Sequence, residues 1–237
     1  MSDVLLTEDA LGKLRTFSDK PGREVPGEAT KSRSLDTIRE SAANSQTCKS
    51  LGTLRSTMVF SVGNPDARII FIGEAPGSEE EKQGEPFVGP AGMLLTRIIE
   101  TMGLSRDDVY ISNILKFRPR IGNSDQGVKN RKPSTEEIAA SLNFVMDEID
   151  VVAPELIIAL GGSAMQGLLG LDEGVNRARG KVHELEKHKV IVTYHPSYLL
   201  RSGSNSEKRK LWEDMLMAMS YLGMPISDKQ RNYFKEH

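Results

Sequence analysis

The segment RIIFIGEAPGSEEEKQGEPFVGPAGMLL, residues 68–95, determines the fold class that we expect for this chain. It begins with an apolar run at residues 69–72, whose length and β-branched content predict a buried strand. The run ends at residues 73–77, where two glycines and a proline permit a tight turn, and an apolar helix is expected soon afterwards. A strand that ends in such a loop is a common place for a ligand site in an open α/β sheet. A purely structural connection is equally consistent with this loop alone.

Three further apolar runs predict buried strands, at residues 109–111, 156–160 and 190–193. Apolar residues at helical spacing predict intervening helices at residues 93–102, 135–149, 162–169 and 206–222. Ser134 and Glu137 form the capping-box pattern at the start of the second of these helices. Strands that alternate with helices predict an α/β fold, here a three-layer α/β/α sandwich around a central, mostly parallel four-stranded sheet.

Polar segments with proline and glycine mark the expected limits of this domain. Residues 1–33 are predicted to be a flexible or partly helical tail with a possible helix at 7–17, residues 34–224 the domain, and residues 225–237 a second tail. Within the domain, we expect a helix at 34–45, an irregular or strand-like segment at 48–60, a long basic loop at 117–133, and a loop-rich segment at 171–188 with possible short strands.

The composition excludes several classes of protein. The chain has 237 residues, of which 38% are hydrophobic and 27% charged, and no run approaches the roughly 18 apolar residues of a membrane span. The first residues do not resemble a secretion signal, and the single cysteine, Cys48, excludes an internal disulfide, so a cytoplasmic location is expected. The net charge of −2 means that nucleic-acid binding would need a local basic patch.

Three polar residues, Glu74, Asn113 and His195, each follow a predicted strand. The carboxyl ends of parallel strands share one edge of a sheet, so these side chains are expected to converge there. Together with Phe87, they would suit a planar heterocycle with carbonyl and N–H edges. Taken singly, each has a structural explanation: a helix cap for Asn113, a solvated carboxylate for Glu74, a turn for His195, and core packing for Phe87.

Four motifs, in this order, resemble those of the uracil-DNA glycosylase superfamily. They are GEAPG at 73–77, EPFVGPAGMLL at 85–95, YISNILKFRP at 110–119 and HPSYLLR at 195–201. The resemblance is closest to family 4, the bacterial and archaeal iron–sulfur type, and extends from about residue 34 to residue 222. It implies a fold that pinches DNA and takes a flipped deoxyuridine into a pocket.

The resemblance also implies roles for individual residues. Phe87 would stack on the base, Asn113 would read its O4 and N3 edge, and His195 would donate a hydrogen bond to O2. Glu80 would crowd the position of a thymine methyl group, and the base would be held by backbone groups of Glu74, Ala75, Pro76 and Gly77. Some other families have a water-activating aspartate where this chain has Ala75. Glu74 is therefore the candidate for orienting the water, or else it only shapes the pocket.

Two segments are candidates for contact with DNA. By resemblance, a loop would press into the helix and fill the gap left by the flipped base; it consists of Ser197, Tyr198, Leu199, Leu200 and Arg201. The basic loop offers a possible phosphate clamp, with a solvated charged loop as an equally good alternative. Its basic residues are Lys116, Arg118, Arg120, Lys129, Arg131 and Lys132.

The chain departs from the family 4 pattern at the metal ligands. Family 4 holds a [4Fe–4S] cluster through four cysteines, and the corresponding positions here are Cys48, Leu51, Phe117 and Ser141. One thiolate cannot hold such a cluster, so none is expected, and no other cofactor or metal is predicted. Cys48 is then an ordinary thiol, and Phe117 is expected to replace the cluster with apolar packing.

These observations predict a monofunctional uracil-DNA glycosylase of base excision repair, a hydrolase that acts as a monomer on uracil-containing DNA and releases free uracil. A glycosylase for another deaminated base, such as hypoxanthine or xanthine, is an alternative. A DNA-binding or protein-interaction module that has kept the pocket without turnover is another. A generic nucleotide-binding protein is a more distant possibility, because neither GxGxxG nor a P-loop occurs.

Overall fold

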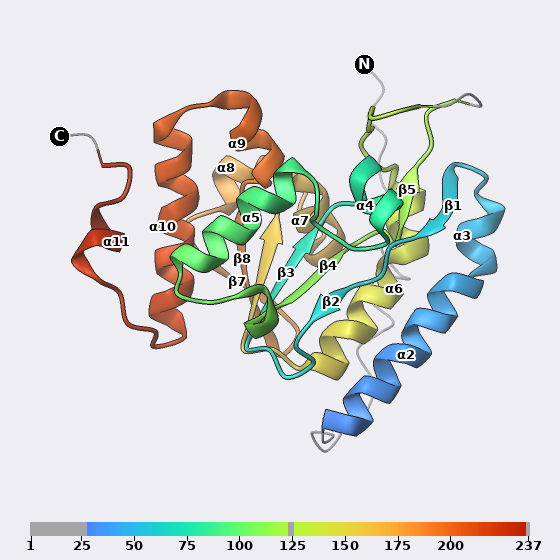
Figure 1. Ribbon diagram of the computed structural model, residues 1–237, viewed down its shortest axis with the longest axis horizontal. Coiled ribbons are helices and arrows are strands. Elements are labelled where there is room, and N and C mark those ends of the chain that lie inside the picture. Colours follow the sequence, from blue (N-terminus) through green and yellow to red (C-terminus); the bar gives the residue numbers. More distant parts are fainter. Residues whose placement is uncertain (1–27, 123–125, 236–237) are drawn as a thin grey trace.

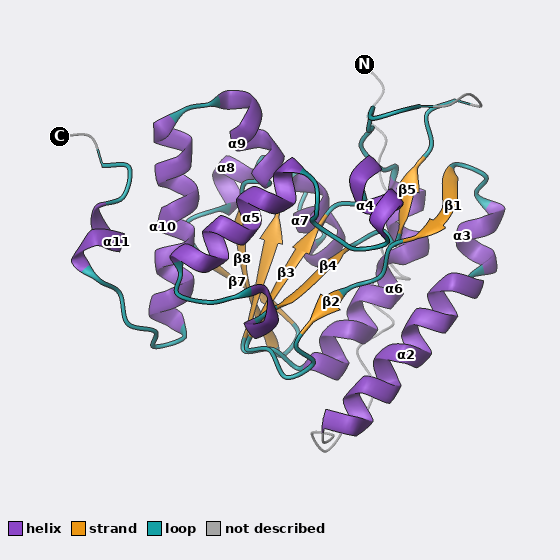
Figure 2. Ribbon diagram, viewed as in Figure 1, coloured by secondary structure: helices purple, strands orange, loops and turns teal. Residues whose placement is uncertain are grey.

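A computed structural model describes residues 28–122 and 126–235 (Figure 1). A six-stranded sheet, ordered β2-β4-β3-β6-β8-β7, lies between two layers of helices (Figure 2). Its strands are β2 (Val62–Gly63), β4 (Tyr110–Asn113), β3 (Ile69–Gly73), β6 (Leu156–Leu160), β8 (His188–Thr193) and β7 (Val182–Leu185). The predicted helix at 7–17 lies outside the described residues.

The four strands predicted from apolar runs form the centre of the sheet. β4, β3, β6 and β8 pair in parallel, with Ile70 opposite both Tyr110 and Ile157. Two edge strands, β2 and β7, pair antiparallel to β4 and β8. The predicted α/β sandwich with a mostly parallel sheet is therefore confirmed, but the sheet has six strands and not the predicted four, because the edge strands β2 and β7 lack the continuous apolar run of a buried strand. The parallel centre brings the carboxyl ends of four strands to one edge.

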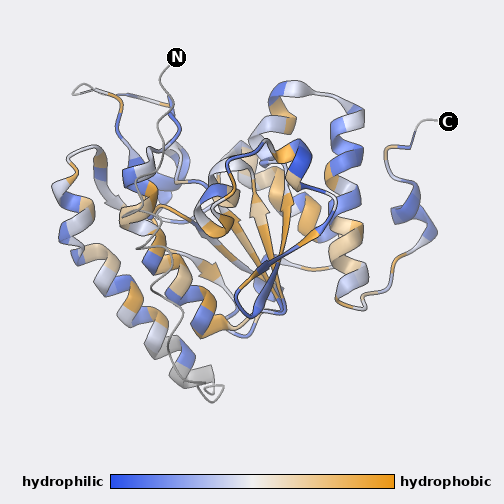
Figure 3. Ribbon diagram, turned by 180° about the vertical axis from the view of Figure 1, so that it is seen from behind, coloured by the Kyte–Doolittle hydropathy of each residue, from blue (hydrophilic) through white to orange (hydrophobic). Residues whose placement is uncertain are grey.

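Alternate residues of the central strands face different helical layers, because side chains of a strand point in turn to opposite faces. Ile70 and Ile72 belong to the cluster formed with α6 (Thr135–Val152) and α7 (Gly162–Leu169). Ile69 and Phe71 belong to the cluster formed with α5 (Pro90–Thr101), α9 (Pro196–Ser202) and α10 (Asn205–Tyr221). Figure 3 shows these strands as an apolar layer between the helices.

The capping box predicted at the start of α6 is present. The Glu137 amide donates to Ser134 Oγ at 3.2 Å, and the Ser134 amide donates to Glu137 Oε2 at 2.8 Å. Arg131 donates two further hydrogen bonds to the same carboxylate, at 2.6 and 2.7 Å. The helix start is thus fixed to the end of the preceding basic segment.

Several element limits differ from the prediction. The first described helix, α2 (Glu28–Asn44), begins before the expected residue 34. The segment expected to be irregular or strand-like contains α3 (Gln46–Ser50) and β1 (Leu54–Met58). β1 pairs antiparallel with β5 (Phe117–Pro119), so the predicted basic loop begins as a strand. Three short helices lie between the strands: α4 (Ser78–Gln83), η1 (Arg106–Asp108) and α8 (Val175–Ala178).

The predicted C-terminal tail contains a helix that packs on the domain. α11 (Asp228–Asn232) lies beside α10, where Trp212 Nε1 donates to Gln230 O at 2.6 Å. Gln230 Nε2 donates to Thr101 O at 2.7 Å, and the Tyr233 ring meets Trp212 edge-on. Among residues 28–122 and 126–235, every helix is too short or too polar to cross a lipid bilayer.

Candidate functional site

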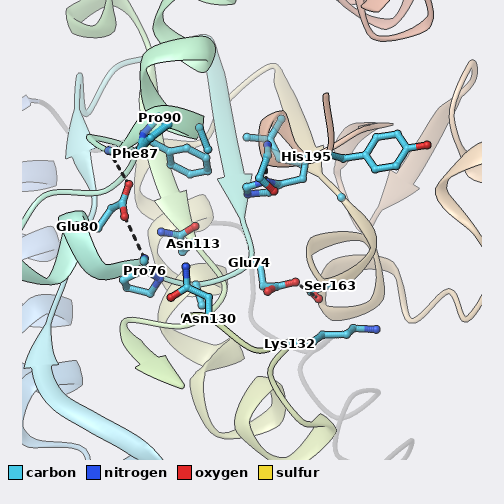
Figure 4. Close-up of a pocket in the computed structure, with 18 of the residues that line it drawn as sticks. Glu74, Pro76, Glu80, Phe87, Pro90, Asn113, Asn130, Lys132, Ser163 and His195 are labelled. Carbon is cyan, nitrogen blue, oxygen red and sulfur yellow. Dashed lines mark hydrogen bonds between the residues drawn. The ribbon is translucent and has the colours of Figure 1, made fainter. Parts of the chain in front are cut away.

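A pocket of about 1100 Å³ lies at the carboxyl ends of the central strands. Glu74 follows β3, Asn113 ends β4, and His195 follows β8, and all three line the pocket together with Phe87 (Figure 4). Segments separated by up to 121 residues therefore meet, as the parallel sheet predicts. The volume is sufficient for a nucleobase and part of its sugar.

The Phe87 ring forms one wall of the pocket and is held by a strained backbone. Phe87 has a φ of 56°, which is unusual for a non-glycine residue. Arg106 donates to the carbonyl oxygens of Phe87 and Pro86 at 3.0 and 2.9 Å, and to Glu85 Oε1 at 3.1 Å. Phe87 is 6% exposed, and its ring stacks near that of His195, with centroids 5.8 Å apart and planes inclined by 30°. Sequence reasoning did not identify Arg106 as the support of this wall.

The imidazole of His195 is held as a neutral ring. The Ser197 amide donates to His195 Nδ1 at 3.2 Å, so this nitrogen acts as the acceptor and Nε2 carries the proton. Burial, and to a smaller extent the positive charge of Arg201, lower the pKa of His195 to about 4. At neutral pH the site therefore contains an uncharged N–H donor.

Glycine at position 161 permits this arrangement. Gly161 has a φ of 90°, and an added Cβ would lie 2.9 Å from His195 Cβ. The Gly161 amide donates to Thr193 O at 2.9 Å, which ties the β6 end to the β8 end. The close approach of these two strand ends thus places His195 against the pocket.

Glu74 lies on the far side of the pocket from Phe87 (Figure 4). Ser163, the second residue of α7, donates to Glu74 Oε2 at 2.5 Å. Burial raises the pKa of Glu74, while the Ser163 hydrogen bond and the charges of Lys132 and Arg201 oppose this effect. Ser163 therefore orients the carboxylate, and the three partners offset only part of the effect of burial, so the pKa stays raised. Ser163 and Lys132 were not identified as pocket residues from the sequence.

Glu80 joins the two loops that surround the pocket. Its carboxylate accepts hydrogen bonds from the backbone amides of Gly77, Val88 and Gly89, at 3.1, 3.1 and 2.9 Å. It also lines the pocket beside Ala75 and Pro76. Glu80 therefore fixes the loop that carries Phe87 relative to the loop that follows β3.

Two basic residues predicted to bind DNA are buried, so this prediction is wrong for them. Lys116 is 1% exposed and pairs with Glu148 at 2.8 Å. Arg118 is 2% exposed and donates to Glu81 Oε2 at 3.1 Å and Asn130 Oδ1 at 2.9 Å. Both charges are satisfied within the protein and cannot reach a phosphate.

Arg118 organises the basic segment instead of binding DNA. It donates to the carbonyl oxygens of Gly127 and Lys129 at 2.7 and 2.8 Å. The buried Gln126 accepts a hydrogen bond from the Ile121 amide at 2.9 Å and donates one to Pro119 O at 3.1 Å.

The other basic residues of the predicted clamp divide into two groups. Arg131 forms an ion pair with Glu137, whereas three residues are exposed: Arg120, Lys129 and Lys132.

The segment predicted as a DNA-inserting loop is the helix α9. Leu199 is 4% exposed and packs in the core, so it does not contact DNA as predicted. Leu200 is 51% exposed, and Arg201 is exposed at the pocket mouth. Ser197 and Tyr198 also line the pocket.

Asn130 is a further pocket residue that sequence reasoning missed. Its Oδ1 accepts a hydrogen bond from Arg118 Nε, so its NH₂ group is the part left to donate to a ligand. This group lies close to the loop after β3, since a Cβ added to Gly77 would be 3.4 Å from its nitrogen. Asn130 and Asn113 lie on the same side of the pocket in Figure 4. Its place within the predicted basic loop at 117–133 gave no signal of this role.

Comparison with known proteins agrees with this geometry. A family model described as "Uracil DNA glycosylase superfamily" matches residues 60–216, which include every strand that contributes to the pocket. The chain belongs to the uracil-DNA glycosylase superfamily. The resemblance inferred from the four motifs is thus confirmed.

Relatives within the uracil-DNA glycosylase superfamily extend over most of the chain. A type-4 uracil-DNA glycosylase of Thermotoga maritima is 43% identical over 170 residues, covering 71% of this chain and 84% of the relative. One from Archaeoglobus fulgidus is 39% identical over 175 residues, covering 70% and 83%. A third, from Sulfurisphaera tokodaii, is 37% identical over 210 residues, covering 85% and 90%.

The positions implied for an iron–sulfur cluster do not fit one in this member of the superfamily. Cys48 is buried and donates to Ala140 O at 3.5 Å, and its Sγ lies 3.6 Å from Ser141 Oγ. Phe117 and Leu51 complete the same apolar cluster. One thiol, one hydroxyl and two hydrocarbon side chains are not a ligand set for a [4Fe–4S] centre. The described residues also include no group of three or more His, Cys, Asp or Glu placed to hold a metal ion.

Proposed function

We propose that this chain is a uracil-DNA glycosylase that flips deoxyuridine out of DNA, hydrolyses its N-glycosidic bond and releases free uracil. The observation that carries the proposal is the neutral His195 ring, whose Nε2–H borders the same pocket as Phe87 and Asn113. Membership of the superfamily and the type-4 relatives support it. In this proposal the enzyme acts as a monomer, and a cytoplasmic location stays a prediction.

The pocket residues divide the work of recognition and catalysis. Phe87 stacks on the flipped base, and the Asn113 amide pairs with its O4 and N3 edge. As the glycosidic bond breaks, negative charge develops on the base, and the His195 Nε2–H donates to O2. Such a fixed donor in a site with little water stabilises the developing charge more than it stabilises the ground state.

Glu74 is proposed to orient the attacking water. Its Oε2 is occupied by the Ser163 hydroxyl, so Oε1 is the oxygen available to a water molecule in the pocket. The nearby charges of Lys132 and Arg201 favour the ionised form of Glu74, which can accept a hydrogen bond from the attacking water. Glu80, held by three amides, is proposed to crowd the position that a thymine methyl would occupy.

The proposed reaction uses no metal cluster. Family 4 enzymes hold one through four cysteines, whereas the corresponding positions here pack Phe117 and Leu51 around a single thiol. No catalytic step above depends on a metal. Purified protein is expected to contain no stoichiometric iron or acid-labile sulfide, and about four of each per chain would contradict this.

The pH dependence of the reaction should reflect the depressed pKa of His195. Because this pKa is about 4 in the folded protein and 6.5 in an unperturbed histidine, the neutral donor persists as the pH falls from 7 to about 5. The single-turnover rate should therefore show no loss centred at pH 6.5. Protonation of His195 also opposes folding, so stability should decline as the pH falls from 6.5 towards 4.

Protonation of Glu74 also lowers the rate at acid pH, and the Glu74→Gln variant separates its contribution from that of His195. Its pKa is raised, so the acid limb of the wild type includes its protonation. A limb near pH 6.5 that persists in Glu74→Gln would show that His195 titrates normally and would contradict the neutral-donor assignment.

The exposed basic residues are proposed to contact phosphates. Reversing two charges in Arg120→Glu/Lys129→Glu should weaken duplex binding and reduce the slope of log Kd against log salt by about 1.8, the value for two lost phosphate contacts. Fluorescence anisotropy between 50 and 200 mM salt measures this slope.

The matched control reverses the same number of charges away from the pocket. The control variant is Lys187→Glu/Lys189→Glu. Lys187 lies in the turn between β7 and β8, and Lys189 lies near the start of β8, at the opposite end of that strand from His195. Its slope should equal that of the wild type. An unchanged slope in Arg120→Glu/Lys129→Glu would show that this segment is a solvated loop.

The proposed activity is tested with an oligonucleotide that contains one deoxyuridine. Enzyme in excess should release uracil, detected by mass spectrometry, and leave an abasic site that alkali cleaves. Oligonucleotides with hypoxanthine, xanthine or thymine at the same position define the base range. Tight binding of uracil-containing DNA without an abasic product would instead indicate a binding module, and preferred release of another base would reassign the substrate.

A further inference from the structure

A buried ion pair lies next to the loops that form the base pocket. The side chains of Lys116 and Glu148 are each 1% exposed, and Lys116 Nζ lies 2.8 Å from Glu148 Oε1 and 3.0 Å from Oε2. The Ser112 hydroxyl donates to Glu148 Oε2 at 2.6 Å. The Phe60 ring covers the ammonium, with its centroid 5.5 Å from Nζ.

The Lys116 ammonium also holds the backbone of the proposed base-reading residue. It donates to Asn113 O at 3.0 Å and to Ser112 Oγ at 2.7 Å. Lys116 ends the bend that follows β4. Two amides of this bend donate to the end of β3 and to the pocket loop after it, from Ile114 to Gly73 O at 3.0 Å and from Leu115 to Glu74 O at 3.1 Å.

Stability alone is a weak reason for this arrangement. Burying two charges costs desolvation energy, and replacing such a pair by apolar side chains of similar volume is often neutral or stabilising. What the pair does provide is a fixed geometry, because a charge-assisted donor aimed at one carbonyl oxygen restricts the position of that peptide.

Asn113 depends on this restriction. Among the described residues, no hydrogen bond fixes its side-chain amide; the residue is 4% exposed, and its Oδ1 packs against Gly73. The direction of the amide therefore follows from its backbone and from close packing. We infer that the Lys116–Glu148 pair is a positioning device that fixes the Asn113 backbone, and thereby sets the affinity of the pocket for the base.

This inference rests on the proposed function, and its test separates the two. The variant Lys116→Met/Glu148→Met removes both charges and keeps similar volume. Binding of free uracil is measured by calorimetry, and binding of duplex DNA with a tetrahydrofuran abasic-site analogue by anisotropy. We expect the Kd for uracil to rise about tenfold, as for loss of one well-placed hydrogen bond, with the Kd for abasic DNA within about twofold.

Ile149→Ala is the matched control for lost stability. Ile149 neighbours Glu148 on α6 and is 1% exposed in the same core. This variant should melt at a lower temperature and bind uracil as the wild type does. If Lys116→Met/Glu148→Met does not fold, Glu148→Gln, which frees the ammonium from its ionic partner, is measured in the same way and should weaken uracil binding selectively.

The outcomes are distinct. Wild-type protein that does not bind uracil overturns the proposed function. A wild type that binds uracil, together with a folded double variant of equal affinity, overturns the positioning role. Equal weakening for uracil and abasic DNA also overturns it, because that result indicates a general structural effect.

Discussion

The His195→Ala variant is expected to lose about 10²- to 10³-fold in the single-turnover rate of uracil release. Among the described residues that line the pocket, His195 is the only ring that offers a neutral N–H, and it lies beside the strained Phe87. A fixed donor to a developing oxyanion contributes about 3–4 kcal/mol to the transition state, and much less to the bound substrate. The loss should therefore lie in the rate and not in the affinity for DNA.

This measurement uses enzyme in excess over DNA, so that binding does not limit the rate. Ser197→Ala is the control, because it removes a hydroxyl 2.8 Å from His195 Nδ1 while the Ser197 amide still donates to that nitrogen. It should retain most of the activity. A His195→Ala rate within about threefold of the wild type would show that another group stabilises the leaving base.

The Gly73→Ala variant should lose about 100-fold in kcat/KM with only modest destabilisation. An added Cβ would lie 2.4 Å from both Asn113 Oδ1 and Phe87 Cζ. The φ of Gly73 is not positive, so the backbone accepts alanine and the side chains must move. These are the two groups proposed to read and stack on the base, and a displacement of about 1 Å in a site is enough for such a loss.

Gly174→Ala is the matched control for this substitution. Gly174 has a φ of −68°, and an added Cβ would meet no atom within 4 Å. Its activity and melting temperature should equal those of the wild type. A fully active Gly73→Ala variant would mean that Asn113 and Phe87 do not define the base pocket, even if uracil release itself is confirmed.

The sequence alone predicted the central sheet and the meeting of distant residues. The four parallel strands are short apolar runs, and burial on both faces leaves this pattern in any sequence that forms them. Since parallel strands present their carboxyl ends at one edge, Glu74, Asn113 and His195 could be placed together without coordinates. The capping box of Ser134 and Glu137 was equally predictable, because it depends on contacts three residues apart.

Only the tertiary structure decided which charged and apolar side chains face the solvent. Lys116, Arg118 and Arg120 follow one another in a basic segment, yet the first two are buried by partners 32 and 37 residues away, Glu148 and Glu81. Nothing local distinguishes a lysine that meets a carboxylate in the core from one that meets a phosphate. Adjacent Leu199 and Leu200 divide in the same way, because α9 turns one into the core formed with α5 and α10 and the other outward. Periodic burial is encoded locally, whereas the pairing of individual charges depends on segments that only folding brings together.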